Sequence, residues 1–449
     1  MPVYFWQGHL NSPGGQTRTL SGVVPHGMRR QPAHERTTKQ RNENPATVNN
    51  RVSLIIKLDD RPGALHDLLG HFKAQGINLT NIESRPTRDG NFSFFVDFIG
   101  TRSDPNIKSL LEKLQHSGSD LTVLDDQTVP WFPRHVWELD LIANRTLDAG
   151  TDLASDHPGF ADPEYRAQRS RIEQLAREYR YGQPLPEIDY TEQERQTWRT
   201  VYETMRARHA QHACPEYQLI MGELEARGIF SPSDVPQARA VSDYLAARTG
   251  FNLRPVAGLL QPRDFLNGLA FRVFFSTQYI RHHSRPHYTP EPDLCHELLG
   301  HAPMFADPAF ADFSHEIGLA SIGASDAEIT RLARCYWHSV EFGVIRSQTG
   351  LKAYGAGLLS SFGEIEHACA PESEQAREIR AWDPETAADQ DYPITDYQPV
   401  YFAADSLTAA RLSMRDHCRK LPRMFYARYV EASKSIWVDR AVRPEKLNV

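Results

Sequence analysis

The sequence has no run of about 18 apolar residues, so it offers no segment long enough to span a bilayer as a helix. Its closest apolar stretch, residues 265–275, is interrupted by Asn267 and Arg272. Basic residues are not in excess: the formal net charge of the 449 residues is −7, which gives no reason to expect a nucleic-acid partner. The length predicts two or three domains with an ample core.

Cysteine is scarce. The five cysteines are scattered and form no Cys-x-x-Cys pair, at Cys214, Cys295, Cys335, Cys369 and Cys418. This pattern argues against a disulfide framework and against a thiolate metal site, and it predicts a reducing compartment, which we take to be the cytoplasm. Although Cys295 adjoins the histidine motif described below, we expect it to pack as a small apolar residue.

Acidic residues are missing from the start of the chain, where Glu35 is the first. Arginine and lysine are present there, and no helical or strand period is visible over residues 1–50. Two interpretations stay open for this segment. It is either a disordered basic tail or an organelle-targeting peptide, and whether it is cleaved is left undecided.

Two histidines and a glutamate form the pattern that points to chemistry. His296 and His301 lie five residues apart, and Glu341 follows His301 after forty residues. A zinc-protease helix spaces its histidines four apart, whereas five steps of about 100° on an α-helix turn the second ring about 140° away from the first. We therefore predict a helix at about 292–299 that ends near Gly300, with His301 presented from the segment after it. Two imidazoles and one carboxylate suit divalent iron with open coordination positions, which favours an oxygenase over a metallohydrolase.

The pattern of apolar residues along the sequence predicts an α+β protein. Residues 51–126 alternate in the order βαββαβ, typical of a ferredoxin-like domain. The expected elements are a strand at 52–58, a helix at 62–75, a hairpin of 77–85 and 92–99 around Asp89-Gly90, a helix at 105–115 and a strand at 121–124. Residues 130–449 are expected to form a mostly helical catalytic domain. Its helices are predicted at about 163–181, 191–209, 215–227, 237–248, 308–320, 326–340 and 357–368, with a late strand at 399–402.

Long segments of the second domain closely resemble the pterin-dependent aromatic amino acid hydroxylases. The likeness runs from about 130 to 430 and is carried by residues 254–260, 263–266, 268–274, 277–282, 288–293, 316–321 and 353–364. In the first domain, residues 60–65 and 81–85 resemble an ACT domain, a regulatory module that commonly binds amino acids. Its expected ligand-binding residues are Gly63, Ala64, Leu65, Ile82, Glu83 and Ser84, with phenylalanine bound between two such domains.

The resemblance implies an iron- and pterin-dependent hydroxylation. His296, His301 and Glu341 would hold Fe(II), and the second cofactor would be tetrahydrobiopterin or a related tetrahydropterin. The pterin site would comprise Val256, Gly258, Leu259, Leu260, Phe265, Glu297, Ala333 and Tyr336. The substrate site would comprise Arg281, Tyr288, Thr289, Pro292, Trp337, Gly357, Ser360 and Ile394, with Arg281 on the carboxylate and Trp337 and Pro292 around the ring. Two positions depart from the pattern, Pro262 in place of a serine and Phe275 in place of a histidine.

Three pocket residues favour phenylalanine over the other aromatic substrates of this family. Trp337 is typical of the phenylalanine and tyrosine types, while Tyr288 and Ile394 are typical of the phenylalanine type. We therefore expect O2-dependent conversion of L-phenylalanine to L-tyrosine, a step of phenylalanine catabolism and tyrosine formation. Hydroxylation of tryptophan or broad specificity is the alternative within the family, and a non-catalytic amino-acid sensor is the alternative of another class. Without the long C-terminal helix of tetrameric relatives, a homodimer or weaker assembly is expected.

Overall fold

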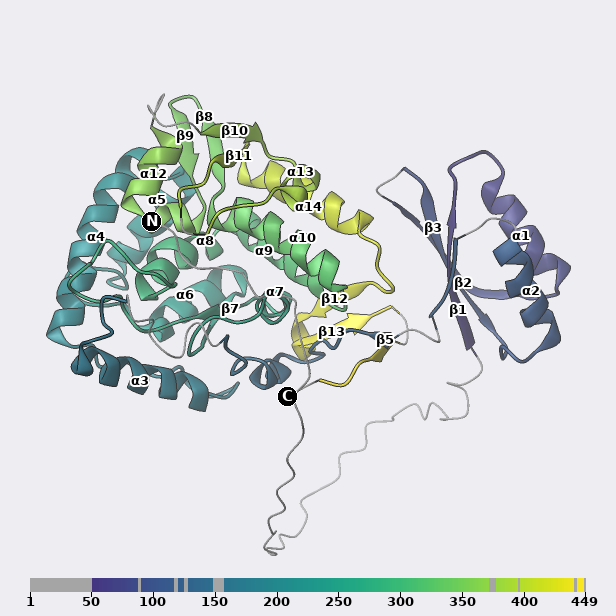
Figure 1. The fold of residues 1–449 in the computed structure, drawn as a ribbon, viewed down its shortest axis with the longest axis horizontal. Coiled ribbons are helices and arrows are strands. Elements are labelled where there is room, and N and C mark those ends of the chain that lie inside the picture. The colour runs from purple at the N-terminus through teal and green to yellow at the C-terminus, as the bar shows by residue number, and fades with distance from the viewer. Residues whose placement is uncertain are drawn as a thin grey trace, which may run out of the picture. The chain divides into compact units, whose positions relative to one another are not determined.

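A computed structural model describes residues 51–447, apart from 88–89, 117–119, 125–127, 148–156, 371–376, 395 and 440–441. The predictions for residues 1–50 and for Asp89 lie outside this range. The chain divides into two compact units, one built mainly on residues 51–123 and the other on the chain from residue 124 onward (Figure 1). No described helix combines the length and apolar character that a membrane crossing needs.

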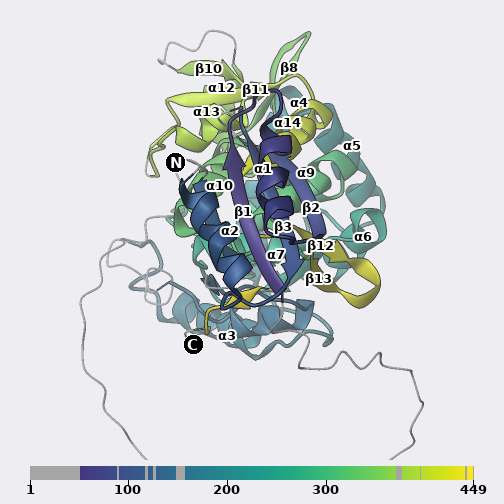
Figure 2. The same ribbon diagram turned by 90° about the vertical axis from the view of Figure 1, so that its right-hand side faces the viewer.

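The first unit is a four-stranded sheet with two helices. Its elements are β1 (Arg51–Leu58), α1 (Ala64–Ala74), β2 (Leu79–Pro86), β3 (Phe92–Ile99), α2 (Pro105–His116) and β4 (Asp120–Val123). The strand order β2-β3-β1-β4 confirms the predicted ferredoxin-like arrangement. Figures 1 and 2 show α1 and α2 on the same face of the sheet.

The core of this unit comes from one face of each helix. Leu68 and Phe72 of α1 are buried, and the Phe72 ring meets Phe98 of β3 edge-on at 5.8 Å. Two further apolar residues of α1, Leu65 and Leu69, are 39% and 37% exposed, so the apolar side of this helix is only partly buried.

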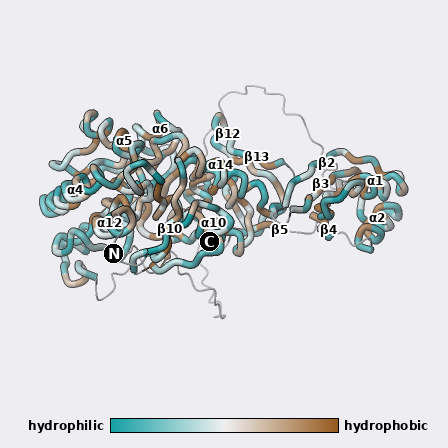
Figure 3. The backbone as a smooth tube through the Cα atoms, turned by 90° about the horizontal axis from the view of Figure 1, so that it is seen from above, coloured by the Kyte–Doolittle hydropathy of each residue, from teal (hydrophilic) through white to brown (hydrophobic). Residues whose placement is uncertain are grey.

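Helices dominate the second unit. They are η3 (Val136–Leu141), α3 (Pro163–Glu178), α4 (Glu192–His212), α5 (Pro215–Ala226), α6 (Ala238–Thr249), α7 (Pro262–Leu269), η5 (His296–His301), α8 (Ala302–Phe305), α9 (Pro308–Ser321), α10 (Asp326–Tyr336), η6 (Trp337–Glu341), α11 (Ala356–Leu359), α12 (Phe362–Cys369), α13 (Pro384–Asp389), α14 (Leu407–Lys420) and η7 (Glu431–Ser433). Figure 3 shows hydrophobic residues gathered in the interior of this unit and hydrophilic ones along outer helices such as α4.

Short strands frame these helices. They are β5 (Thr128–Val129), β6 (Asn252–Pro255), β7 (Val273–Ser276), β8 (Val344–Ser347), β9 (Gly350–Ala353), β10 (Glu378–Ala381), β11 (Val400–Ala404), β12 (Ala427–Val430), β13 (Ser435–Val438) and β14 (Arg443–Pro444). The largest sheet has the order β10-β11-β8-β9, and β6 pairs in parallel with β7. The chain leaving β7 runs directly into the loop that carries Arg281, which places that loop beside the histidine motif.

Two of the seven long helices predicted for the catalytic domain differ from the structure. The helix expected at 326–340 is α-helical only to Tyr336 and continues as the π-helix η6 to Glu341. The helix expected at 357–368 is interrupted at Ser360 and Ser361, because the Ser361 side chain caps the start of α12 by accepting the Glu364 N–H.

Candidate functional site

Both elements that carry the candidate metal ligands are π-helices. The segment η5 spans both histidines from His296 to His301, and η6 ends at Glu341. The predicted α-helix at 292–299 with His301 behind its end is therefore wrong. A π-helix closes its hydrogen bonds between residues five apart, so His301 is stacked one turn beyond His296 and on the same side. On an α-helix, a spacing of five residues would point the two histidine rings apart. On this π-helix, the same spacing brings them together.

Gly300 has a different role from the helix stop that its position predicts. It lies buried inside η5, and a Cβ atom there would come within 2.7 Å of the Ala356 carbonyl oxygen. A Cβ at Gly357 would likewise lie 2.6 Å from the Phe342 ring. These glycines let the short helix α11 approach both π-helices, which it contacts together. Gly357 thus packs beside Glu341 as part of the scaffold.

The three side chains meet in a fully enclosed site. His296 Nε2 lies 3.0 Å from His301 Nε2, and Glu341 places its carboxylate oxygens 3.5 Å from the first nitrogen and 3.1 Å from the second. All three residues are at most 1% exposed. Two imidazole nitrogens do not approach this closely without a shared proton or cation, so the geometry fits a metal ion bound by both rings and the carboxylate.

Ser360 fixes the tautomer of His296. The Ser360 hydroxyl donates to the Ala356 carbonyl at 2.8 Å, so it can only accept from His296 Nδ1, which lies 2.9 Å away. The proton therefore sits on Nδ1, and the lone pair of Nε2 points toward His301 and Glu341. This is the arrangement that a metal-binding imidazole requires.

Replacing Ser360 by alanine should weaken metal binding without removing a ligand. We expect Fe(II) affinity to fall by about 10- to 100-fold, because His296 loses the acceptor that orients its ring. Equilibrium dialysis against iron of the Ser360→Ala protein measures this, and Ser361→Ala is the matched control, since Ser361 only caps α12. Equal iron affinity in wild type and Ser360→Ala would contradict the assigned tautomer.

The electrostatics also fit a cation. Burial lowers the pKa of His296 to about 4, so the ring is neutral and able to coordinate at physiological pH. Burial raises the pKa of Glu341, but the neighbouring His301 and His296 outweigh that effect and keep the pKa below its usual range. Glu341 Oε1 is buried with His301 Nε2 3.1 Å away, and His301 Nδ1 is buried without a hydrogen bond to the described residues. A buried carboxylate in this state needs a compensating charge, which a divalent ion supplies.

Of the predicted pterin residues, Phe265 and Tyr336 are connected to these ligands by ring contacts. The Phe265 ring meets Tyr336 edge-on at 5.3 Å, and the Tyr336 ring is stacked 6.3 Å from the His301 ring. Leu259 accepts a backbone hydrogen bond from Leu147, which holds the loop that carries Gly258 and Leu260. Val256 pairs with Ser276, and Ala333 lies one turn before Tyr336 on α10.

Glu297 follows the first ligand and is buried. The Thr277 backbone N–H and hydroxyl both lie 3.1 Å from its Oε1 atom. Burial raises the pKa of Glu297 well above its ordinary value, more than the two Thr277 hydrogen bonds lower it. Its surroundings therefore favour the protonated form of this carboxyl group next to the candidate ligands.

One edge of the Arg281 guanidinium is hydrogen-bonded to Asp293. Nε and Nη2 donate to the two carboxylate oxygens of Asp293 at 2.9 and 2.7 Å, and Nη1 donates to the Pro286 carbonyl at 3.3 Å. Of the five N–H donors of an arginine, two then remain, one on each terminal nitrogen, and they form a fork. Such a fork matches a carboxylate in bidentate fashion.

Asp293 is a residue that the motif analysis did not single out. Besides Arg281, its oxygens accept the backbone N–H groups of Arg281 and of His296, at 2.8 and 3.1 Å. One fully buried carboxylate therefore connects the guanidinium of Arg281 to His296, the first candidate metal ligand. The signal available in the sequence was an acidic residue inside an apolar, proline-bounded segment.

The other predicted substrate residues differ in their burial and in their hydrogen bonds. Trp337 is buried, donates from Nε1 to Gln398 at 2.9 Å and stacks on Tyr392 with the ring centroids 4.2 Å apart. Thr289 donates its hydroxyl to the Glu291 carbonyl at 2.6 Å, and the Pro292 carbonyl accepts from Thr277. Tyr288 and Ile394 are half-buried.

The predicted regulatory residues lie in the first unit. Gly63 precedes α1 with a φ of 88°, a left-handed conformation that favours glycine, and Ala64 and Leu65 start the helix. Ile82, Glu83 and Ser84 belong to β2, the edge strand of the sheet, and Ile82 is 42% exposed.

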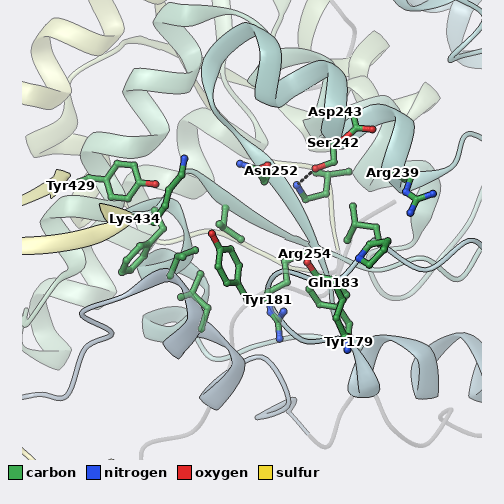
Figure 4. Close-up of a pocket in the computed structure, with 17 residues that line it drawn as sticks. Tyr179, Tyr181, Gln183, Arg239, Ser242, Asp243, Asn252, Arg254, Tyr429 and Lys434 are labelled. Carbon is green, nitrogen blue, oxygen red and sulfur yellow. Dashed lines mark hydrogen bonds between the residues drawn. The ribbon is translucent and has the colours of Figure 1, made fainter. Parts of the chain in front are cut away.

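A cavity of about 260 Å³ lies apart from these residues (Figure 4). It is lined by Tyr179, Tyr181, Ser242, Arg254 and Tyr429 among others, and it contains none of the predicted metal, pterin or substrate residues. Arg254 is paired on its outer side with Asp140 at 2.9 Å. The geometry of the site is therefore defined by the ligand cluster, and this cavity is a separate feature.

Comparison with known proteins adds to this geometry. Residues 130–446 match the family described as biopterin-dependent aromatic amino acid hydroxylase, and residues 52–116 match the ACT domain. The phenylalanine-4-hydroxylase of Mus musculus is 48% identical over 394 residues, which cover 86% of each chain. The tryptophan 5-hydroxylase of Xenopus laevis is 42% identical over 396 residues, covering 86% of this chain and 82% of that one.

A solved structure shows the same likeness. The phenylalanine hydroxylase of Chromobacterium violaceum, with bound iron(III) and the oxidised cofactor 7,8-dihydrobiopterin, is 28% identical with a TM-score of 0.50. The match covers 56% of this chain and 90% of that chain.

Proposed function

This chain belongs to the biopterin-dependent aromatic amino acid hydroxylase family, and on that basis we propose that His296, His301 and Glu341 hold its iron and that Arg281 anchors its substrate. It is a phenylalanine 4-monooxygenase that converts L-phenylalanine and O2 to L-tyrosine with non-haem Fe(II) and a tetrahydropterin. The observation that carries the residue assignment is the enclosed two-histidine, one-carboxylate cluster, joined to the arginine fork through Asp293.

The iron, when bound, supplies open coordination positions at which O2 and the reduced pterin can react. The residues of the chain orient the ligands and bind the substrate and the pterin. Ser360 holds the His296 ring so that its lone pair faces the ligand cluster. The free fork of Arg281 receives the substrate carboxylate, and Trp337 and Pro292 bracket the aromatic ring. Phe265 offers an aromatic surface to the pterin, and Glu297 lies beside it as a buried carboxyl group whose protonated form is favoured.

Discrimination between aromatic substrates is assigned to Trp337, Tyr288 and Ile394. Trp337 is immobilised by its hydrogen bond to Gln398 and by stacking on Tyr392, so its ring forms a fixed wall. A fixed wall accepts a single six-membered ring more readily than a fused one. One such apolar contact is worth about 1–3 kcal/mol, which sets the scale of the expected selectivity.

Amino acid turnover tests this assignment. Purified, Fe(II)-loaded protein is supplied with a tetrahydropterin and O2 and is offered phenylalanine, tyrosine and tryptophan in separate reactions. We expect kcat/KM for phenylalanine, measured as tyrosine formation, to exceed kcat/KM for tyrosine and for tryptophan by about 10-fold or more.

The other outcomes have distinct meanings. Predominant hydroxytryptophan or dihydroxyphenylalanine would keep the chemistry and overturn the roles of Trp337, Tyr288 and Ile394. A protein that binds iron but gives no product from any of the three would favour the amino-acid sensor.

The ACT unit is proposed as a regulatory domain over residues 51–126, preceding a catalytic domain over 130–449. Phenylalanine is proposed to bind between two such domains, at Gly63, Ala64 and Leu65 and at residues 82–84 of β2, and the assembly is proposed to be a homodimer or a weaker homo-oligomer. The partial exposure of Leu65 and Ile82, at 39% and 42%, supports an apolar surface available for this purpose. Light scattering that shows a stable tetramer would contradict the dimer.

A further inference from the structure

A second cluster of metal-binding side chains lies outside the iron centre. It consists of Asp162, His282 and His283, each of which offers one ligand atom within 4.8 Å of the others. Asp162 Oδ2 lies 3.1 Å from His282 Nε2, and the centroids of the two histidine rings are 4.1 Å apart. Among the residues that the structure describes, this group and the iron centre are the two sets with such geometry.

Asp162 is fixed in place and presents one oxygen. It caps the N-terminus of α3, where Oδ1 accepts the backbone N–H groups of Glu164 and Tyr165, both at 3.0 Å. Oδ2 is directed to His282 instead. The Tyr165 hydrogen bond, and then the His282 contact, hold the pKa of this carboxyl below its usual value, so the residue is ionised at neutral pH.

His282, like His296, has a serine hydroxyl beside its Nδ1 atom. Its Nδ1 lies 2.8 Å from the Ser284 hydroxyl, as the Nδ1 of His296 lies 2.9 Å from that of Ser360. The His282 ring is buried and packs edge-on against Tyr165 at 5.0 Å. Nδ1 also accepts the Ser284 backbone N–H at 3.3 Å, so the ring proton lies on Nε2, which donates to Asp162 Oδ2, and a bound ion would take the place of that proton.

His283 completes the set from the solvent side. It follows His282 directly, and its ring remains accessible to water, so an ion could enter without opening the fold. One carboxylate oxygen and two imidazole nitrogens with room for water are a ligand set for a borderline divalent ion such as Zn²⁺.

We propose that Asp162, His282 and His283 form a second metal site, which takes a divalent transition ion of the zinc class. An ion held there connects the start of α3 to the loop that continues from Arg281. The cluster carries one formal negative charge when both imidazoles are neutral, so the ion meets a site of opposite charge. The site is independent of the iron centre, since the two share no side chain.

Metal analysis of the full-length, iron-loaded protein tests the proposal. After dialysis against micromolar Zn²⁺, the wild-type chain should carry one zinc in addition to its iron. The variant His283→Gln should bind zinc at least about 10-fold more weakly and keep its iron, because only the second site loses a ligand. The variant His66→Gln, which changes an exposed histidine of α1, should behave as wild type.

A second variant separates the two centres. His296→Ala, which removes an iron ligand, should still retain one zinc per chain at the proposed site. Zinc that is lost in His296→Ala, or zinc that displaces the iron of the wild type, would show binding at the iron centre and overturn the proposal. Equal zinc binding by wild type and His283→Gln, or no zinc on either, would overturn it as well.

Discussion

The His296→Ala protein is expected to lose bound iron and to make tyrosine more than about 100-fold more slowly than the wild type. Removing even an outer partner of a metal-binding histidine costs about 10- to 100-fold in metal affinity or activity, so loss of the ligand itself should cost more. The change also leaves Glu341 buried with one fewer partner. Iron content by metal analysis and the rate of tyrosine formation are measured on the same sample.

His338→Gln is the matched control for this experiment. His338 is also a buried histidine and lies on the same π-helix as Glu341, but its Nε2 faces the Gln390 carbonyl at 3.0 Å and its ring packs on Phe402. Its variant should keep iron even if it is less stable to urea. If His296→Ala bound iron and turned over as well as His338→Gln, the ligand assignment would be wrong.

Arg281→Lys is expected to lower kcat/KM for phenylalanine by about 30-fold or more while iron stays bound. Lysine keeps the positive charge but lacks the planar fork, so it cannot pair with Asp293 and with a substrate carboxylate at the same time. A charged hydrogen bond is worth about 1.5–3 kcal/mol, and loss of about 2 kcal/mol gives the expected factor. The loss should appear mainly in KM, because the carboxylate is bound alike in the ground and transition states.

Arg285→Lys is the control for the arginine change. Arg285 is an exposed arginine of the same loop, near the Tyr288 ring, and lies outside the proposed fork. Its variant should show wild-type KM. An Arg281→Lys enzyme with unchanged KM would assign Arg281 a purely structural pairing with Asp293.

Much of this fold was predictable because its signals are local. The ferredoxin-like unit follows from alternating apolar residues and short connections, and most long helices of the catalytic unit begin at clear caps, such as Asp162 before α3 and Thr191 before α4. The candidate ligands could be proposed from the sequence because the segments around them resemble a known family, and the structure brings the three side chains together.

The conformation of the ligand helices could not be predicted, for a physical reason. No residue type in the sequence distinguishes a π-helical turn from an α-helical one. Here the extra residue of the turn is accommodated by packing against α11, which lies far away in the sequence. Gly300 was therefore interpreted as a helix stop, whereas its role is to let Ala356 approach. In the same way, the Ser360 contact with His296 joins residues 64 positions apart, a distance over which periodicity carries no information.

The carboxylate of Asp293 has one further consequence. Both of its oxygens accept hydrogen bonds from the Arg281 guanidinium, and one of them also accepts the backbone N–H of His296. A displacement of Arg281 or of His296 would therefore move the other residue through Asp293. Whatever factor the metal contributes to the affinity for substrate, the substrate must return to the affinity for the metal, because the two equilibria form a closed cycle. If bound iron raises the affinity for phenylalanine, bound phenylalanine raises the affinity for iron by the same factor, and iron-poor enzyme is then the form that holds phenylalanine more weakly.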